Sequence, residues 1–121
     1  MQKLENFPSE RRRYPRIETS IQMNLKADKR NVRAETIDLS RSGVCCLVNR
    51  PIEMMTSLKI VLMLPDEGDP DDVMYVECEG IVVRNEKTEN GHHLSIFFNE
   101  IESSELGKLA AYIASHRSFV Y

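Results

Sequence analysis

The sequence predicts an all-β fold with one C-terminal helix, arranged as a small antiparallel barrel or sandwich. Apolar and polar residues alternate in short segments along most of the chain, as they do in half-buried strands. Turn-forming residues separate these segments, and helical spacing appears only after about residue 100. Because no helix is expected between successive strands, parallel βαβ units are excluded.

Six or so strands are expected between residues 17 and 98. The first, Ile17–Ala27, alternates for much of its length, and a turn at residues 28–31 leads into the second, Val32–Ser40. Gly80 within a long strand indicates a bulge or bend. An acidic surface loop is expected at residues 65–72, and the remaining strands are expected at residues 44–48, 58–64, 73–86 and 92–98.

The helix is predicted over about residues 100–116. Asn99 followed by Glu102 resembles a capping box, and Ser103 is a competing N-cap. One helical face collects the apolar residues Ile101, Leu106, Leu109, Ala110 and Ile113.

The chain length of 121 residues fits one domain, predicted to span residues 11–121 with its barrel at about 17–98. Residues 1–10 lack periodicity and are expected to form a flexible N-terminal arm. Pro15 favours an extended backbone, so residues 11–16 are expected to form a loop, called here the arginine loop. No apolar run approaches the ~20 residues of a membrane span or the length of a signal peptide. We therefore expect a soluble, cytoplasmic protein without membrane insertion.

The charge is unevenly distributed along the chain. Residues 1–34 hold nine Lys/Arg and four Asp/Glu, whereas residues 66–105 hold two Lys/Arg and twelve Asp/Glu. A general DNA- or RNA-binding domain is broadly basic, so this pattern argues against nucleic-acid binding. It is compatible with a small anion held at one place.

The cysteines and histidines do not form a pattern typical of metal sites or disulfides. Cys45, Cys46 and Cys78 are odd in number and lack CxxC spacing, so we expect small buried side chains. Adjacent strand residues face opposite sides, which separates Cys45 from Cys46 and His92 from His93. No histidine is placed to activate Ser40 as a nucleophile, so we expect no enzyme, no metal and no cofactor.

Two short stretches carry the functional chemistry, "RRRYPR" at residues 11–16 and "DLSRSG" at residues 38–43. In the second, Asp38 and Ser40 are two apart at a strand end and are expected to point the same way. A carboxylate accepts two parallel N–H bonds, as the Watson–Crick edge of guanine offers. An arginine fork matches guanine O6 and N7 or phosphate oxygens. The two stretches together are suited to enclose a guanine nucleotide from two sides.

Each stretch alone is weak evidence, because arginine clusters are usually solvated and Asp-x-Ser is usually turn chemistry. In this order and on this strand plan, they resemble the PilZ domain, the bacterial receptor module for cyclic di-GMP. That family carries R-x-x-x-R in a loop before its first strand and [D/N]-x-S-x-x-G on a neighbouring strand. Only Arg12 and Arg16 have the first spacing, and Asp38, Ser40 and Gly43 match the second. The resemblance covers residues 11 to about 115 and implies a six-stranded antiparallel barrel of the split-barrel type.

The resemblance also implies a role for each motif residue. Arg12 and Arg16 would contact a guanine edge and phosphate, Asp38 and Ser40 would contact the other guanine edge, and Gly43 would leave room for the ligand. Three further arginines are candidates. Arg11 bears on whether one ligand or an intercalated ligand dimer binds, whereas solvent exposure is favoured over phosphate contact for Arg13 and Arg41.

The implied function is a non-enzymatic receptor or adaptor. Its arginine loop would change conformation around cyclic di-GMP and present a new surface to an unidentified downstream protein in motility, polysaccharide or biofilm control. One alternative is a PilZ-like interaction module without nucleotide, although such members have usually lost one motif. A small nucleic-acid binder using "RRRYPR" is a second alternative. The sequence leaves open the partner, the affinity, one versus two ligands per chain, and the oligomeric state.

Overall fold

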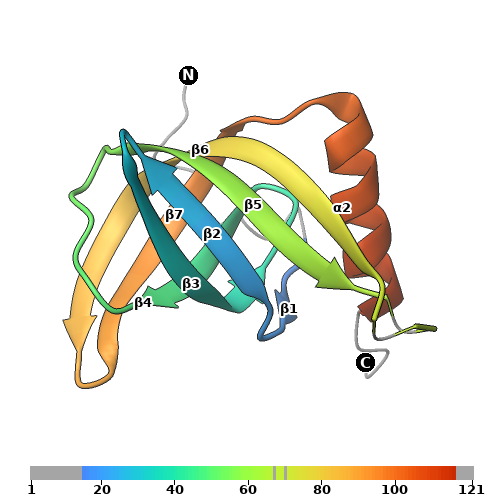
Figure 1. Cartoon of the computed structure of the whole chain (residues 1–121), viewed down its shortest axis with the longest axis horizontal. Coiled ribbons are helices and arrows are strands. Elements are labelled where there is room, and N and C mark those ends of the chain that lie inside the picture. The colour runs from blue at the N-terminus through green and yellow to red at the C-terminus, as the bar shows by residue number, and fades with distance from the viewer. Residues whose placement is uncertain (1–14, 67, 70, 117–121) are drawn as a thin grey trace.

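The computed structural model describes residues 15–66, 68–69 and 71–116. Within these ranges the chain forms seven strands and one helix (Figure 1). The strands are β1 (Ile17–Glu18), β2 (Gln22–Ala27), β3 (Arg30–Leu39), β4 (Gly43–Val48), β5 (Ser57–Pro65), β6 (Val73–Thr88) and β7 (Gly91–Glu100), and the helix is α2 (Ser103–His116).

Six of these strands close into an antiparallel barrel. Neighbouring strands follow the order β3-β2-β5-β6-β7-β4, and β4 pairs again with β3 to complete the circuit. The short β1 adds to the edge of β3 beyond the end of β2. The predicted six-stranded antiparallel barrel with one C-terminal helix is therefore confirmed.

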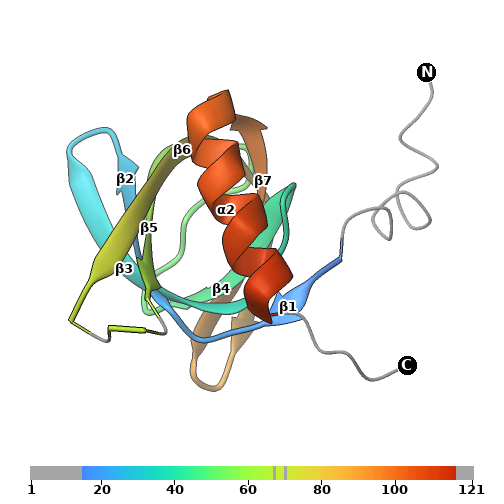
Figure 2. The same cartoon turned by 90° about the vertical axis from the view of Figure 1, so that its right-hand side faces the viewer.

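Inward-facing apolar side chains fill the barrel. Burial alternates along β2, β4 and β5, as the sequence period requires. Each fully buried aliphatic side chain contributes about 1.5–3 kcal/mol relative to an exposed one. The helix α2 lies across one end of the barrel, as Figure 2 shows in a view along the barrel toward that end. Its buried residues are Leu109, Tyr112 and Ile113.

Side chains of α2 also satisfy the backbone of an open strand edge. β7 pairs with β6 only from Glu79 onward, so the preceding part of that β6 edge has no strand partner. The Glu105 carboxylate accepts the Glu77 N–H at 2.8 Å, and Lys108 Nζ donates to the Tyr75 carbonyl at 3.1 Å. The helix thus covers an edge that would otherwise be open to strand pairing.

The helix start differs from both predicted caps. The first turn is closed by the Leu106 N–H donating to the Glu102 carbonyl at 2.8 Å, and the helix begins at Ser103. Glu102 therefore occupies the cap position, whereas Asn99 still belongs to β7. The prediction of Asn99 was wrong because β7 runs two residues past its expected end, and that of Ser103 was wrong because Ser103 is already the first residue of the helix.

The first expected strand is interrupted. Residues 19–21 separate β1 from β2, so the predicted continuous strand Ile17–Ala27 was wrong at this point. The buried Thr36 hydroxyl bridges the interruption: it accepts the Ile21 N–H at 2.9 Å and donates to the Thr19 carbonyl. These bonds keep β1 and β2 on the same edge of β3.

A bulge in β3 changes the direction of Asp38. Thr36 lies opposite Cys46 and Asp38 opposite Cys45, so Ile37 is an extra residue on the β3 side. Thr36 is buried, while Asp38 turns outward and Leu39 returns to the core. The bulge interrupts the alternation expected along this strand, and no Gly or Pro in the sequence marks its position.

The other predicted turns are tighter than expected. The β2–β3 hairpin turns at Asp28 and Lys29, with Asp28 at φ 55°, and the β6–β7 hairpin turns at Glu89 and Asn90. The register shift expected near Gly80 is present between Glu79 and Gly80.

In the described part of the chain, no helix has both the length and the apolar character needed to cross a bilayer.

Candidate ligand-binding site

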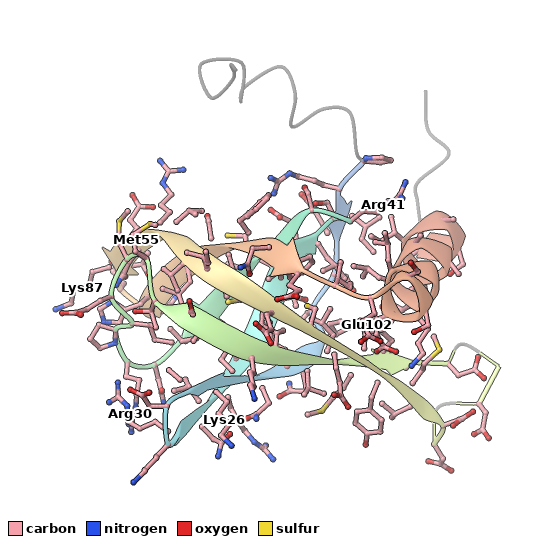
Figure 3. All side chains as sticks on the ribbon, turned by 90° about the horizontal axis from the view of Figure 1, so that it is seen from above. Lys26, Arg30, Arg41, Met55, Lys87 and Glu102 are labelled. Carbon is pink, nitrogen blue, oxygen red and sulfur yellow. The ribbon has the colours of Figure 1, made fainter. Side chains whose placement is uncertain are left out.

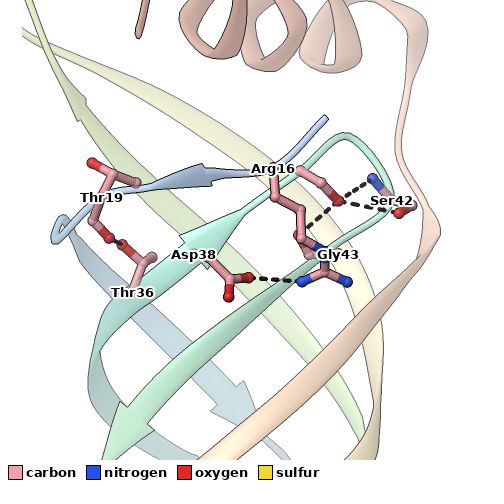
Figure 4. A network of polar contacts seen from close by, with 7 residues as sticks. Arg16, Thr19, Thr36, Asp38, Ser42 and Gly43 are labelled. Carbon is pink, nitrogen blue, oxygen red and sulfur yellow. Dashed lines mark hydrogen bonds and ion pairs between the residues drawn. The ribbon is translucent and has the colours of Figure 1, made fainter. Parts of the chain in front are cut away.

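An ion pair on the outer wall of the barrel joins the two stretches singled out in the sequence. Arg16 Nη1 lies 2.8 Å from Asp38 Oδ1, although 22 residues separate them along the chain (Figure 4). The Arg16 side chain is 45% exposed and that of Asp38 is 26% exposed. Both charged groups are thus in contact with solvent.

The short strand β1 positions Arg16. Ile17 is buried and lies opposite Leu39, while Glu18 lies opposite Asp38. This pairing anchors the residue after Arg16 in the core at the end of β3. The bulge at Ile37 turns the Asp38 carboxylate to the same outer surface. Two local features of the backbone therefore bring the pair together.

The segment after Asp38 forms a tight turn. The Ser40 N–H donates to the Gly43 carbonyl at 2.9 Å, and Ser40 Oγ accepts the Ser42 N–H at 3.2 Å. The two hydroxyl groups of Ser40 and Ser42 also lie 3.1 Å apart. Ser40 is only 1% exposed, so its hydroxyl supports the turn and is not directed to solvent. A ligand contact by this hydroxyl remains a prediction.

Gly43 allows two strands to approach closely. A methyl group at this position would lie 2.4 Å from the Ile96 carbonyl oxygen of β7. Gly91 is the only glycine of the described residues with a positive φ. Gly43 therefore serves the close approach of β4 and β7 and not a left-handed turn.

The remaining arginine predictions have different outcomes. Arg11, Arg12 and Arg13 lie outside the described residues. Arg41 lies in the turn between Ser40 and Gly43 and is exposed (Figure 3). Exposure leaves this side chain accessible to a phosphate, so the choice between solvent exposure and phosphate contact stays a prediction for Arg41.

A row of outward side chains extends the surface beyond Asp38. Asp38 in β3 lies opposite Cys45 in β4, Cys45 opposite Ser95 in β7, and Ser95 opposite Arg84 in β6. Sequence reasoning missed Ser95 and Arg84 as neighbours of Asp38. Strand alternation indicates which residues face outward, but only the register between strands far apart in sequence shows that they form one row.

Cys45 lies in the middle of this row. It is half-buried, unlike Cys46 and Cys78, which are buried as predicted. Burial raises the pKa of the Cys45 thiol above its usual value, and the charge of Asp38 raises this pKa further. The guanidinium groups of Arg16 and Arg84 act in the opposite direction. The pKa of this thiol therefore depends on charged groups at both ends of the row.

A family model described as the PilZ domain matches residues 10–115. The chain belongs to the PilZ domain family. The match includes both stretches of the site and the helix, so the predicted resemblance is confirmed. No curated protein sequence matches the chain.

Solved structures agree with the PilZ fold. The inhibitor of motility MotI/DgrA from Bacillus subtilis is 16% identical with a TM-score of 0.74, covering 95% of this chain and 51% of that protein. The PilZ domain of YcgR from Escherichia coli with c-di-GMP is 20% identical with a TM-score of 0.65, covering 88% and 91%.

A longer YcgR structure from Escherichia coli, also in complex with c-di-GMP, is 19% identical with a TM-score of 0.66. That match covers 87% of this chain and 45% of the YcgR chain. The chain therefore spans about half the length of two of these three structures. At these identities the likeness shows the shared fold.

Proposed function

We propose that this PilZ domain is a cyclic di-GMP receptor whose binding residues include Arg12, Arg16 and Asp38, with the turn from Ser40 to Gly43 shaping the site. The observation that carries the proposal is the meeting of Arg16 and Asp38 on the outer wall of the barrel. These residues belong to separate motifs, and both motifs are intact in the sequence.

The energetics favour replacing this ion pair by ligand contacts. An exposed ion pair contributes roughly 0–1 kcal/mol to stability, because water screens it. A hydrogen bond to a charged group contributes about 1.5–3 kcal/mol. The guanine N–H groups are donors for the Asp38 carboxylate, and guanine or phosphate oxygens are acceptors for Arg16. Breaking the ion pair when the ligand binds therefore costs little free energy compared with what the new ligand contacts contribute.

The receptor acts without catalysis in this proposal, and it works in the cytoplasm. Binding changes the conformation of the arginine loop, residues 11–16, and the closed loop forms part of a surface for a downstream protein. Several charge-assisted bonds are needed, since ordering each backbone residue costs about 1–2 kcal/mol. Loss of a single motif arginine is thus expected to be severe.

Calorimetric titration with cyclic di-GMP tests the proposal. We expect the wild type to bind, and Arg16→Ala and Asp38→Ala to lose binding at tens of micromolar ligand. Arg33→Ala is a matched control, because Arg33 is exposed on β3 but lies opposite Asn24, away from Asp38. A wild type that does not bind, or full binding by Asp38→Ala, would contradict the proposal and favour a protein-interaction module that needs no nucleotide.

The same titration determines stoichiometry. If Arg11 supports a ligand dimer, the wild type binds two ligands per chain and Arg11→Ala binds one. A ratio of one for both proteins excludes this role of Arg11.

A further inference from the structure

Two bulges on separate strands align the two charged ends of the outer row. In β3 the extra residue Ile37 turns Asp38 outward, and in β6 the extra residue Val83 places Arg84 opposite Ser95. Both bulges lie beside the same cross-strand row. Bulges frequently redirect side chains next to functional sites. The row therefore has a carboxylate at one end and a guanidinium at the other.

The row is long enough to contact more than one part of a cyclic dinucleotide. It crosses four adjacent strands, so its ends are separated by about three strand spacings, or roughly 14 Å along the barrel wall. Arg16 and Asp38 occupy only one end. Arg84 is exposed at the other end, and no hydrogen bond or ion pair to another described residue engages its side chain.

An exposed aromatic ring lies next to this row. Phe97, on the same outer face of β7 as Ser95, is 51% exposed. It pairs with Gly43 on one side and Ile81 on the other. Because Gly43 has no side chain, nothing from β4 covers the ring at that pairing. An exposed ring beside a site for a purine ligand offers a stacking surface.

We propose that the ligand site extends across β4 and β7 to β6, so that Arg84 and Phe97 contact the bound dinucleotide at the end remote from Asp38. This inference rests on the proposed cyclic di-GMP binding and adds a second guanidinium and an aromatic surface to it. Arg84 binds phosphate or guanine oxygens, and Phe97 stacks against a base. Ser95 and Cys45 form the floor between the two ends.

Matched exposed residues provide the controls. Arg33 is an exposed arginine on β3 outside the row, and Tyr75 is an aromatic residue 52% exposed on β6 opposite Met63. We expect Arg84→Ala and Phe97→Ala each to weaken cyclic di-GMP binding by about 5- to 150-fold in calorimetry. Arg33→Ala and Tyr75→Ala are expected to bind within about twofold of the wild type. Circular dichroism checks that each variant is folded, and Arg84→Gln is a second, conservative variant.

Cys45 gives an independent readout of the floor. Cyclic di-GMP is expected to slow alkylation of Cys45 by iodoacetamide at alkaline pH, with Cys45→Ser identifying the labelled thiol. If the wild type binds, Asp38→Ala does not, and Arg84→Ala and Phe97→Ala match their controls, the extended site is wrong while the receptor function stands. Unchanged Cys45 alkylation at saturating ligand also overturns the extended site. Absence of binding by the wild type refutes both.

Discussion

At position 43 a side chain and the neighbouring strand would compete for the same space. A glycine there is one element of the motif that identifies the family, and the resemblance assigns it to ligand access. The structure adds a reason that does not involve ligand, because the Ile96 carbonyl of β7 lies where a methyl group would be. Backbone in a paired strand cannot rotate away as a side chain can.

We therefore expect Gly43→Ala to lower the free energy of unfolding by about 1–3 kcal/mol, the usual range for overpacking. Gly107→Ala is the matched control, since no atom lies within 4 Å of a methyl group at this exposed position of α2. That change is expected to be neutral or to stabilise by up to about 1 kcal/mol through helix propensity. Chemical denaturation of both variants measures the difference. Equal stabilities would show that Gly43 has no packing role.

At the scale of single residues, prediction from sequence succeeded where spacing alone decides and failed where backbone irregularity decides. The spacing of the two motifs was enough to select Arg16 and Asp38 as residues of one candidate site. The outward direction of Asp38 depends on the bulge at Ile37, which alternation cannot show. The buried hydroxyl of Ser40 depends on a turn whose geometry is set by hydrogen bonds to Ser42 and Gly43.

At the scale of elements, the strands were predictable because the period of two is strong wherever one face is buried. The helix was predictable from its change of period. Its first residue was not, since β7 continues through Asn99 to Glu100 and the helix already includes Ser103. The row from Asp38 to Arg84 was also not predictable, because it requires the register of four strands, two of which, β4 and β7, are far apart in sequence.

The stabilisation that the contact between α2 and β6 provides is expected to depend on pH. A backbone hydrogen bond from Glu77, followed by the bond with Lys108, lowers the pKa of Glu105. Because folding lowers this pKa, the folded chain binds fewer protons than the unfolded chain as the pH falls toward it. The stabilisation is therefore present above the unfolded pKa of about 4.3 and is lost as the pH falls through the folded value.

We expect Glu105→Gln to be less stable than the wild type at pH 7, with the difference shrinking at pH 3. Chemical denaturation at both pH values tests this. Glu102→Gln is a suitable control because Glu102 also lies at the start of the helix, whereas its side chain has no hydrogen bond to any residue that the structure describes. A Glu105→Gln difference that stays constant with pH would assign the effect to packing and not to charge.

At the scale of the whole molecule, the closed barrel forms one wall of the proposed site, and the arginine loop is the part proposed to change conformation. Arg16 lies at the junction, next to the short β1 strand that is anchored through Ile17. Arg12 lies four residues earlier, outside the described residues. A ligand held by both arginines is therefore expected to connect the loop to the barrel wall.

Limited trypsin digestion tests this connection. Cyclic di-GMP is expected to slow cleavage after Arg11, Arg12 and Arg13, because the loop is proposed to close around the bound ligand. Asp38→Ala keeps every trypsin site, so cleavage of this variant should not respond to ligand. Equal protection of both proteins would show that the effect does not arise from the proposed site.

The most direct test of a receptor site on this barrel wall is to locate the residues that cyclic di-GMP contacts on the folded chain. At 14.0 kDa the protein is suited to amide NMR, and a titration with cyclic di-GMP follows the backbone amides of all strands in one experiment. We predict the largest shift changes at Glu18 and from Asp38 to Cys45, extending to Ser95 and Arg84. Shift changes confined to the distant β2–β3 hairpin around Asp28, or no changes at saturating ligand, would contradict a receptor site on this wall of the barrel.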